Sequence, residues 1–332
     1  MHQQATGKHV WNSAEYAGRL DWIHQFSADE LGELEAAAEI ARKSGVRLED
    51  ASRELFPLPR LAPLIKNIRR ELSEGSGFVM LRGIPVERYS HDELGAIYWG
   101  LGAHLGIGVT QSLKGDRLGH VMDIGGDRVR YYTRGGELEF HMDPVDVVGL
   151  LCLRTAKSGG ESRIVSSMSI YNTILAERPD LLPILQRGFH YSRRAQDPEG
   201  KQPWTLHRVP VFQDGVMGTE CYFLPAGVRV AAEDGAPWSA QDQAAMDYVA
   251  SVAGRPELFL DMSFREGDIQ FLNNRRILHA RTDYVEDPAR KRLLYRLWLM
   301  MPDWPPRPAS MRPHAAETDR AGGGFAVKGE AA

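Results

Sequence analysis

The first part of the chain carries apolar side chains at helical spacing. Residues 27–30 (Ser-Ala-Asp-Glu) have the pattern of a capping box, in which a serine and a glutamate close the first turn of a helix. The apolar positions that follow are Leu31, Leu34, Ala38 and Ala41. Gly45 then supplies a stop signal, because glycine is common just beyond the last helical turn. The chain is therefore predicted to begin with an amphipathic helix.

Two more helices and one buried strand are predicted to follow. One helical run extends over about residues 61–72, and a second capping box at residues 90–93 opens another helix. The buried stripe of that helix is Leu94, Ile97, Leu101 and Leu105. Between the two helices, GSGFVMLRG has a short apolar centre bounded by glycines, which indicates a buried strand.

From about residue 119 the pattern changes to short β-rich runs separated by Gly, Asp and Pro. Many short strands with turn signals between them predict a sandwich or barrel and argue against a βαβ fold. The predicted strands are HVMDI, RVRYYT, VVGLLCLR, SRIV, GFHYS, RVPVF, TECYF, LFLDMSF, DIQFL and KRLLYRLWLMM. Two helical insertions interrupt them, MSIYNTILAER and residues 239–254. We therefore predict a mainly β fold with flanking helices.

The same pattern divides the chain into three parts. Residues 1–76 are predicted to be a helical extension packed on the core, and residues 77–302 a β domain with helical insertions. Residues 303–332 are rich in Pro, Gly and Ala with little periodicity, so we expect a loosely ordered tail.

Composition narrows the range of partners. A formal net charge of −4, with 25% charged residues, shows no bias toward nucleic acid. The N-terminus lacks the apolar stretch of a signal peptide, and no window approaches the length of a membrane span, so no membrane partner is expected. Cys152 and Cys221 lie in apolar runs, where buried reduced thiols are typical, and a cytoplasmic location fits them.

The stretch EFHMDPVDVV carries the first candidate for chemistry. On a strand, His141 and Asp143 would point to one face, because side chains alternate. A His–Asp hydrogen bond at a strand end explains the pair equally well. His279 lies in the apolar run ILHA, where a lone histidine is more often a core residue. Taken together, however, the three residues are the ligand set of a facial triad for non-haem Fe(II).

Two arginines follow the second histidine. Arg292 lies 13 residues beyond His279, and strand alternation in KRLLYRLWLMM places Arg292 and Arg296 on one face of an apolar strand. A desolvated guanidinium is costly unless it meets an anion, and its planar fork suits a carboxylate. That anion is either a protein carboxylate, Asp283 or Glu286, or a small dicarboxylate held in a pocket.

These motifs resemble those of the taurine dioxygenase/TfdA family of Fe(II)/2-oxoglutarate-dependent oxygenases, of which clavaminate synthase is another relative. The family pattern is an HxD or HxE pair, a distal His, and an Arg roughly a dozen residues beyond it. The similarity covers about residues 77–302 and takes in GGES, where the family often has GG, an acidic residue and Thr or Ser. It implies a double-stranded β-helix, or jelly roll, with helices around it.

The resemblance also implies roles for single residues. The iron ligands, and hence the catalytic residues, would be His141, Asp143 and His279. Arg292 would bind the distal carboxylate of 2-oxoglutarate, with the hydroxyl of Ser162 as a second partner. Arg296 would face the substrate or the metal-side carboxylate. Which arginine holds 2-oxoglutarate stays open, because alternation places both on one face.

The implied activity is oxidation of a small-molecule substrate, with Fe(II) as cofactor and O2 and 2-oxoglutarate as co-substrates. The outcome would be hydroxylation, desaturation or ring closure, with succinate as the second product. An anionic substrate is favoured if Arg296 faces it, and assembly into a homo-oligomer stays open.

Two other functions are compatible with the same residues. A Zn(II)-dependent hydrolase would use the same three ligands with water in the fourth position. A non-catalytic jelly-roll binding protein would use the polar residues only for hydrogen bonds. The residues expected at the mouth of the pocket are Gln111, Tyr131, Tyr132, Asn273 and Asn274.

Overall fold

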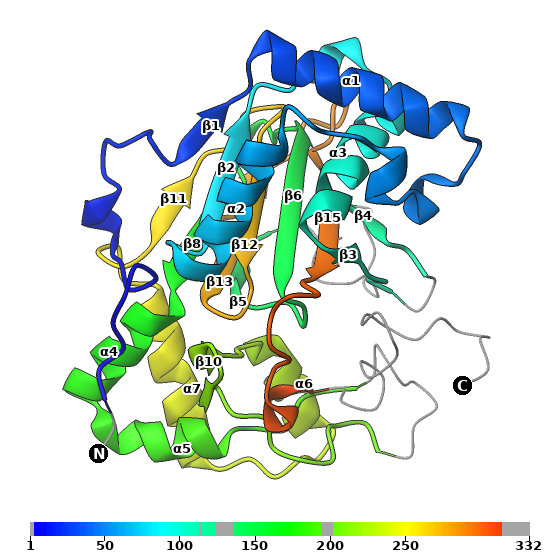
Figure 1. Cartoon of the computed structure of the whole chain (residues 1–332). Helices are drawn as coiled ribbons and strands as arrows, with labels where there is room; N and C mark the ends of the chain where they lie inside the picture. The colour runs from blue at the N-terminus through cyan, green and yellow to red at the C-terminus, as the bar shows by residue number, and fades with distance from the viewer. Residues whose placement is uncertain (1–2, 113–114, 124–135, 194–201, 314–332) are drawn as a thin grey trace.

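The computed structural model describes residues 3–112, 115–123, 136–193 and 202–313 (Figure 1). Two β-sheets form its core. The larger, seven-stranded sheet has the order β1-β2-β12-β6-β15-β3, and β4 also pairs with β15. Its strands are β1 (Ile23–Gln25), β2 (Phe78–Arg82), β3 (Ile107–Gly108), β4 (Leu118–Val121), β6 (Val147–Arg154), β12 (Ile269–Asn273) and β15 (Leu293–Met300).

The smaller sheet has four strands in the order β11-β8-β13-β5. These strands are β5 (Leu138–His141), β8 (Ser162–Ser166), β11 (Leu260–Met262) and β13 (Ile277–Arg281). Two further strand pairs stand outside both sheets: β7 (Ser158–Gly159) with β14 (Tyr284–Val285), and β9 (Phe212–Gly215) with β10 (Gly218–Cys221). In both main sheets, strands from the second half of the chain lie between strands from the first half, as in a jelly roll.

A buried cluster joins the inner faces of the two sheets. It contains Phe78 and Leu272 from the larger sheet together with Ile164 and Ile277 from the smaller one. The alternation of apolar residues along these strands accounts for the close packing of the two layers. The prediction of a mainly β jelly roll with flanking helices is therefore confirmed.

Helices cover the outside of each sheet (Figure 1). The helices are α1 (Ala28–Lys43), α2 (Ala62–Glu74), α3 (His91–Leu105), α4 (Ser167–Glu177), α5 (Leu182–Arg187), α6 (Pro225–Glu233) and α7 (Ala240–Ala253). Helices α1 to α3 share one core cluster with the larger sheet, through residues such as Leu34, Ile68 and Leu101. Helices α4 to α7 share another with the smaller sheet. No helix among the described residues is long and apolar enough to cross a membrane.

The predicted helix starts agree with the structure. Ser27 and Glu30 form both hydrogen bonds of a capping box at α1, and Ser90 and Glu93 do the same at α3. Ser239 opens α7 in the same way. These caps satisfy backbone N–H groups that a helix leaves without partners in its first turn, which is why local sequence predicts them well.

Some predicted strands differ from the structure. GFHYS and RVPVF form only isolated bridges, Phe189 with Val209 and Ser192 with Trp204, although Phe212 begins β9. RVRYYT lies outside the described residues. The strand expected through HMD ends at His141, so that Asp143 lies in the loop that leads to β6.

Part of the expected tail is packed on the core. Trp304 and Met311 are buried, and Arg307 donates hydrogen bonds to backbone carbonyls of the core. Residues 303–313 therefore differ from the expectation of a loose tail, because two large apolar side chains anchor them. Residues 314–332 lie outside the described part of the chain.

Two helical glycines should respond in opposite directions to the same substitution. A Cβ at Gly32 in α1 would meet nothing within 4 Å, so Gly32→Ala should stabilise the protein by about 0.5–1 kcal/mol. A Cβ at Gly100 in α3 would overlap the ring of Phe56, so Gly100→Ala should destabilise it by about 1–3 kcal/mol. Urea denaturation of both variants measures the two effects, and a shift of the same sign in both would contradict the packing described for α3.

Candidate active site

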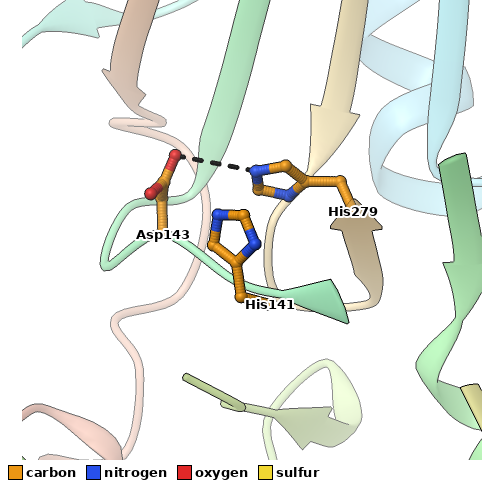
Figure 2. Close-up of side chains that lie close together, drawn as sticks. All are labelled: His141, Asp143 and His279. Atoms are coloured by element: carbon orange, nitrogen blue, oxygen red, sulfur yellow. Dashed lines mark ion pairs between the residues drawn. The ribbon is translucent and has the colours of Figure 1, made fainter. Parts of the chain in front are cut away.

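Three metal-capable side chains converge where the smaller sheet meets the loop after β5. Strand β13 pairs with β5 so that His279 stands directly opposite His141. Asp143 follows two residues later, and one potential ligand atom from each residue lies within 4.8 Å of the others (Figure 2). All three residues are buried. Strand pairing therefore places the distal histidine beside the HMD motif.

The ring of His141 is oriented by the backbone of its own strand. Its Nδ1 lies 2.8 Å from the carbonyl oxygen of Glu139, and because a carbonyl only accepts, Nδ1 must donate. The proton of the neutral ring is then on Nδ1, which leaves a lone pair on Nε2. This tautomer is the form in which imidazole binds a metal through Nε2.

His279 is also held in its neutral form. Burial, and then the nearby His141, lowers the pKa of His279 to about 3. Its Nε2 lies 3.9 Å from Oδ2 of Asp143, and its buried Nδ1 has no hydrogen-bond partner among the described residues. The ring nitrogen of His279 that faces the carboxylate of Asp143 is therefore Nε2.

Asp143 supplies the negative charge of the cluster. Its Oδ2 accepts a hydrogen bond of 2.9 Å from the indole N–H of Trp298 and lies 3.5 Å from Nη1 of Arg296. Burial alone raises the pKa of the Asp143 carboxyl, but Arg296, the two histidines and the indole together hold that pKa below its ordinary value. One carboxylate and two imidazoles form a donor set that fits a divalent transition metal with open positions.

Arg292 is buried without a protein carboxylate beside its guanidinium. Within the described part of the chain, its one side-chain hydrogen bond runs from Nη2 to the carbonyl of Gly160 at 3.4 Å, and Nη1 has no partner. Glu286 accepts only from the backbone N–H of Arg292, and Asp283 forms no ion pair with it there. The alternative of pairing with a protein carboxylate is therefore wrong for the described residues.

The environment of Arg292 is suited to a bound anion. Burial, and then the charge of Arg281, lowers the pKa of Arg292 to about 10, so the guanidinium is still charged at neutral pH. Its guanidinium lies 5.4 Å from the centre of the Tyr284 ring. It also lines a pocket of about 230 Å³ with Cys152 and the Gly159–Glu161 backbone region. A buried charge of this kind is costly until an anion meets it.

The two arginines do not lie on one continuous strand. Strand β15 begins at Leu293, and its pairing with β6 shifts between Leu293 and Leu294. Arg296 lies beside the metal-capable cluster, where its Nε donates to Gln111 at 2.8 Å. Arg292 lies toward Gly160 and Tyr284 instead. The shift in pairing is why simple alternation could not separate their positions.

Ser162 is the first residue of β8 and is buried. Its hydroxyl lies 3.2–3.4 Å from the side-chain amide of Gln270, on β12 of the larger sheet. Ser162 lies two residues after Gly160, whose carbonyl accepts a hydrogen bond from Arg292. The hydroxyl therefore lies between the two sheets.

The described residues that were expected at the pocket mouth are buried inside the protein. Asn273 and Asn274 are fully buried, and they donate to the carbonyls of Leu72 and Asp143, respectively. The expectation that they line the mouth is wrong, because both are fully buried: Asn273 ends β12, and Asn274 belongs to the turn between β12 and β13. Gln111 is buried and holds Arg296, whereas Tyr131 and Tyr132 lie outside the described residues.

Sequence reasoning assigned no role to Trp298, and it expected Asn274 only at the pocket mouth. Trp298 hydrogen-bonds the carboxylate of Asp143, and Asn274 bonds its backbone carbonyl. Alternation along β15 places Trp298 on the face of Arg296 and gives a signal for it. No local signal identifies Asn274, because its partner lies 131 residues away in the chain.

Comparison with known proteins identifies similar chains. A profile described as "Taurine catabolism dioxygenase TauD, TfdA family" matches residues 44–298. FR-33289 synthase of Streptomyces rubellomurinus is 29% identical over 323 residues, which are 95% of each chain. The taurine hydroxylase-like protein SAT17 of Stachybotrys chartarum is 29% identical over 310 residues, 86% of this chain and 77% of that protein.

Solved structures share the fold. An asparagine oxygenase in complex with Fe(II), 2S,3S-3-hydroxyasparagine and succinate superposes with a TM-score of 0.69 at 16% identity, covering 92% of this chain and 99% of its own. The non-heme iron oxygenase OrfP in complex with Fe and alpha-ketoglutaric acid gives 0.62 at 14% identity, covering 84% and 94%. At these identities the likeness establishes the jelly-roll architecture.

Trp298→Phe should weaken divalent metal binding. The change removes the N–H donated to Asp143, and loss of such an outer partner costs about tenfold in metal affinity. Trp99→Phe is the matched control, because the indole of Trp99 is also buried and donates to the carbonyl of Ala51 at 2.9 Å. Titration with Co(II), followed by its visible absorption, gives both dissociation constants. Equal constants for the two variants would contradict the role given to the indole.

Proposed function

Because the chain belongs to the taurine catabolism dioxygenase TauD, TfdA family, we propose that His141, Asp143 and His279 bind its Fe(II). The matched profile covers residues 44–298, and this family membership makes the chain an Fe(II)/2-oxoglutarate-dependent dioxygenase that oxidises a small molecule. The proposal concerns which residues bind the metal and 2-oxoglutarate. Its main support is the buried cluster of one ionised carboxylate and two imidazoles, of which His279 is held neutral.

The donor set fits iron for three reasons. Its ligand atoms lie within 4.8 Å of one another, the pKa of its carboxyl is held below the ordinary value, and His141 is oriented with Nδ1 on a backbone carbonyl, which leaves Nε2 free to bind. Two histidines and one carboxylate leave open positions for a co-substrate and O2. When bound there, Fe(II) supplies the activation of O2 that is coupled to conversion of 2-oxoglutarate to succinate.

Arg292 is proposed to bind the distal carboxylate of 2-oxoglutarate. The guanidinium is charged, buried and without a carboxylate partner among the described residues, so a bound carboxylate would restore the interactions lost on burial. Ser162 would donate its hydroxyl to the same carboxylate, in exchange for its contact with Gln270. A zinc hydrolase on the same three ligands would give Arg292 no anion to bind.

Arg296 is proposed to act on the metal side. Its guanidinium lies 3.5 Å from Asp143 and favours the ionised form of that carboxyl, as a ligand requires. Gln111 accepts from Nε and also donates to the backbone carbonyl of Arg296, which fixes the direction of the side chain. The burial of these groups keeps bulk water away from the reacting centre.

The substrate is proposed to be a small molecule with an anionic group. Hydroxyasparagine and hydroxy-L-Arg, the ligands of similar solved structures, each carry a carboxylate, and taurine, in the name of one relative, carries a sulfonate. Arg296 supplies a cation beside the metal ligands that such a group would meet. Hydroxylation is the favoured outcome, since those ligands are hydroxylated compounds.

The test of the metal site uses the two histidines. Wild-type protein with Fe(II) and 2-oxoglutarate, mixed without O2, should show a weak visible charge-transfer band. His141→Ala and His279→Ala should each lose the band and most Fe(II) affinity, by at least about 100-fold, because each removes a ligand. His190→Ala is the control: its Nδ1 also bonds a backbone carbonyl, that of Thr205, at 2.8 Å. Tight Fe(II) binding by both ligand variants would refute the assignment.

Arg292→Lys should raise the KM for 2-oxoglutarate by about 10- to 100-fold, the cost of one or more charge-assisted hydrogen bonds. An ammonium cannot reproduce the two-pronged contact of a guanidinium with a carboxylate. Fe(II) affinity should change little, because Arg292 does not contact the three ligands. Succinate formation at varied 2-oxoglutarate measures the effect. If Arg296→Lys gave this result and Arg292→Lys did not, the two roles would be exchanged.

A further inference from the structure

The loop that carries Asp143 is held by groups from outside the two sheets. This ligand loop, residues 143–146 (Asp-Pro-Val-Asp), connects β5 to β6. The amide of Asn274 donates to the backbone carbonyl of Asp143, and the backbone N–H of Asn274 donates to the carbonyl of Asp146 at 2.8 Å. Both ends of the ligand loop are therefore bound to the turn between β12 and β13.

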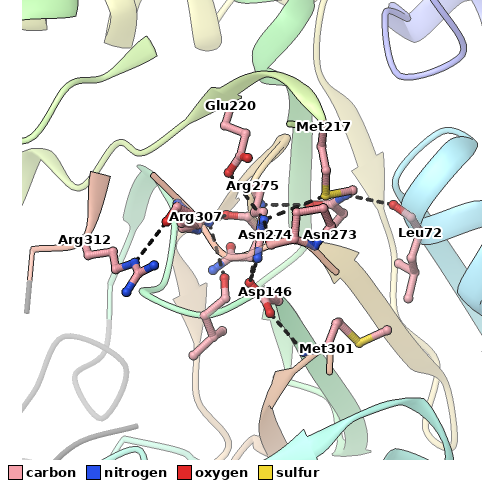
Figure 3. Close-up of polar contacts among 12 residues, drawn as sticks. Leu72, Asp146, Met217, Glu220, Asn273, Asn274, Arg275, Met301, Arg307 and Arg312 are labelled. Atoms are coloured by element: carbon pink, nitrogen blue, oxygen red, sulfur yellow. Dashed lines mark hydrogen bonds and ion pairs between the residues drawn. The ribbon is translucent and has the colours of Figure 1, made fainter. Parts of the chain in front are cut away.

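A buried ion pair fixes the last residue of the ligand loop. Asp146 accepts from Nε of Arg275 at 2.8 Å, and Nη2 of Arg275 lies 2.6 Å from the same oxygen (Figure 3). The other oxygen accepts from the backbone N–H of Met301 at 2.9 Å. Asp146 and Arg275 are each about 2% exposed, and Glu220 lies 3.6 Å from Nη1 of the arginine. A buried pair with this many partners strongly restricts the backbone at Asp146.

The segment after β15 covers this ion pair. The carbonyl of Pro305 accepts from Nη1 of Arg275 at 2.7 Å, and the ring of Trp304 lies 5.5 Å from its guanidinium. Trp304 is itself buried in the core cluster of the larger sheet. The chain beyond Met301 is therefore part of the structure that surrounds the ligand loop.

Arg307 links all of these parts. Its Nη2 donates to the carbonyl of Asn274 at 2.7 Å (both residues are labelled in Figure 3) and to that of Val145 at 3.4 Å. Its Nη1 donates to the carbonyl of Cys221 at 3.3 Å. One guanidinium thus contacts the ligand loop, the turn that binds it and the strand β10. Its planar fork supplies several donors in one rigid group, as such a bridge requires.

We propose that residues 301–307 position the metal-ligating carboxylate, and that Arg307 is the positioning residue through which they act. The proposal rests on the proposed role of Asp143 as an iron ligand. β5 ends at His141, so among the described strands none pairs with the backbone at Asp143. Its carbonyl accepts instead from the side chain of Asn274 and from the backbone N–H of Val145, and the carbonyl of Val145 accepts from Arg307. A ligand that is off by a fraction of an ångström binds metal poorly, so these contacts set the affinity.

The experiment compares two arginines in the full-length protein. Arg307→Met removes the bridge to the ligand loop. Arg208→Met is the control, because Arg208 is also half-buried and donates to two backbone carbonyls, those of Gly188 and Pro237; it also lies 3.6 Å from Asp242 but contacts none of the three metal-capable residues. Each variant is titrated with Co(II) and, without O2, with Fe(II) plus 2-oxoglutarate, and the Tm of the metal-free protein is recorded.

Arg307→Met should bind both metals about tenfold more weakly than wild type. Arg208→Met should bind them like wild type, with a comparable fall in Tm. Arg307→Lys should recover part of the affinity, since an ammonium can donate to Asn274 and Val145 but cannot also reach Cys221 in one rigid fork. If Arg307→Met does not fold, the metal affinity of Arg307→Lys tests the proposal instead.

The inference is overturned if the Arg307 variants bind metal like wild type, or if Arg208→Met loses affinity to the same extent, since the contacts would then act on stability alone. Failure of the proposed function has a different signature. In that case wild-type protein itself would bind neither metal and show no charge-transfer band.

Discussion

The register between β13 and β5 is the constraint on which the site depends. Antiparallel pairing sets His279 opposite His141, and because side chains alternate along a strand, a slip by one residue would turn either imidazole away from the other. The neighbouring pairing of β13 with β8 runs over five consecutive residues, from Ile277 to Arg281, and holds β13 in the sheet, whereas the register with β5 shifts between His279 and Arg281. The geometry of two of the three metal-capable groups is thus a property of the smaller sheet.

The third group, Asp143, is held by a different kind of interaction. It lies beyond the end of β5, and its carboxylate is placed by the indole of Trp298 and the guanidinium of Arg296, both from β15 in the larger sheet. The facing layers of the jelly roll therefore each supply part of one site. This division explains why the metal-capable cluster lies between the sheets, where a charge needs partners from both layers.

Two buried arginines, Arg275 and Arg292, differ in how many protein groups bind their guanidinium groups. Arg275 meets a complete set of protein partners around Asp146, which suits a group that fixes a loop. The guanidinium of Arg292 donates to one carbonyl at 3.4 Å and pairs with no carboxylate among the described residues, as expected of a group that binds an anionic ligand. Since burying a guanidinium without an anion is costly, such an incomplete set of partners marks a binding group rather than a structural one.

Local sequence determined helices α1 to α4 and α7 and most core strands, together with the spacing of His141, Asp143 and His279, whereas α5 and α6 were not predicted. Capping boxes and apolar periodicity act within a few residues, so they can be read without the fold. The end of β5 at His141, the pairing shift before Leu294 and the packing of residues 303–313 were decided only in the tertiary structure. They depend on partners more than a hundred residues away, such as Asn274 for the loop of Asp143, and no local pattern encodes such a contact. For the same reason, the sequence indicated that Arg292 or Arg296 needs an anion, but only the fold could show that Arg292 has no carboxylate partner among the described residues.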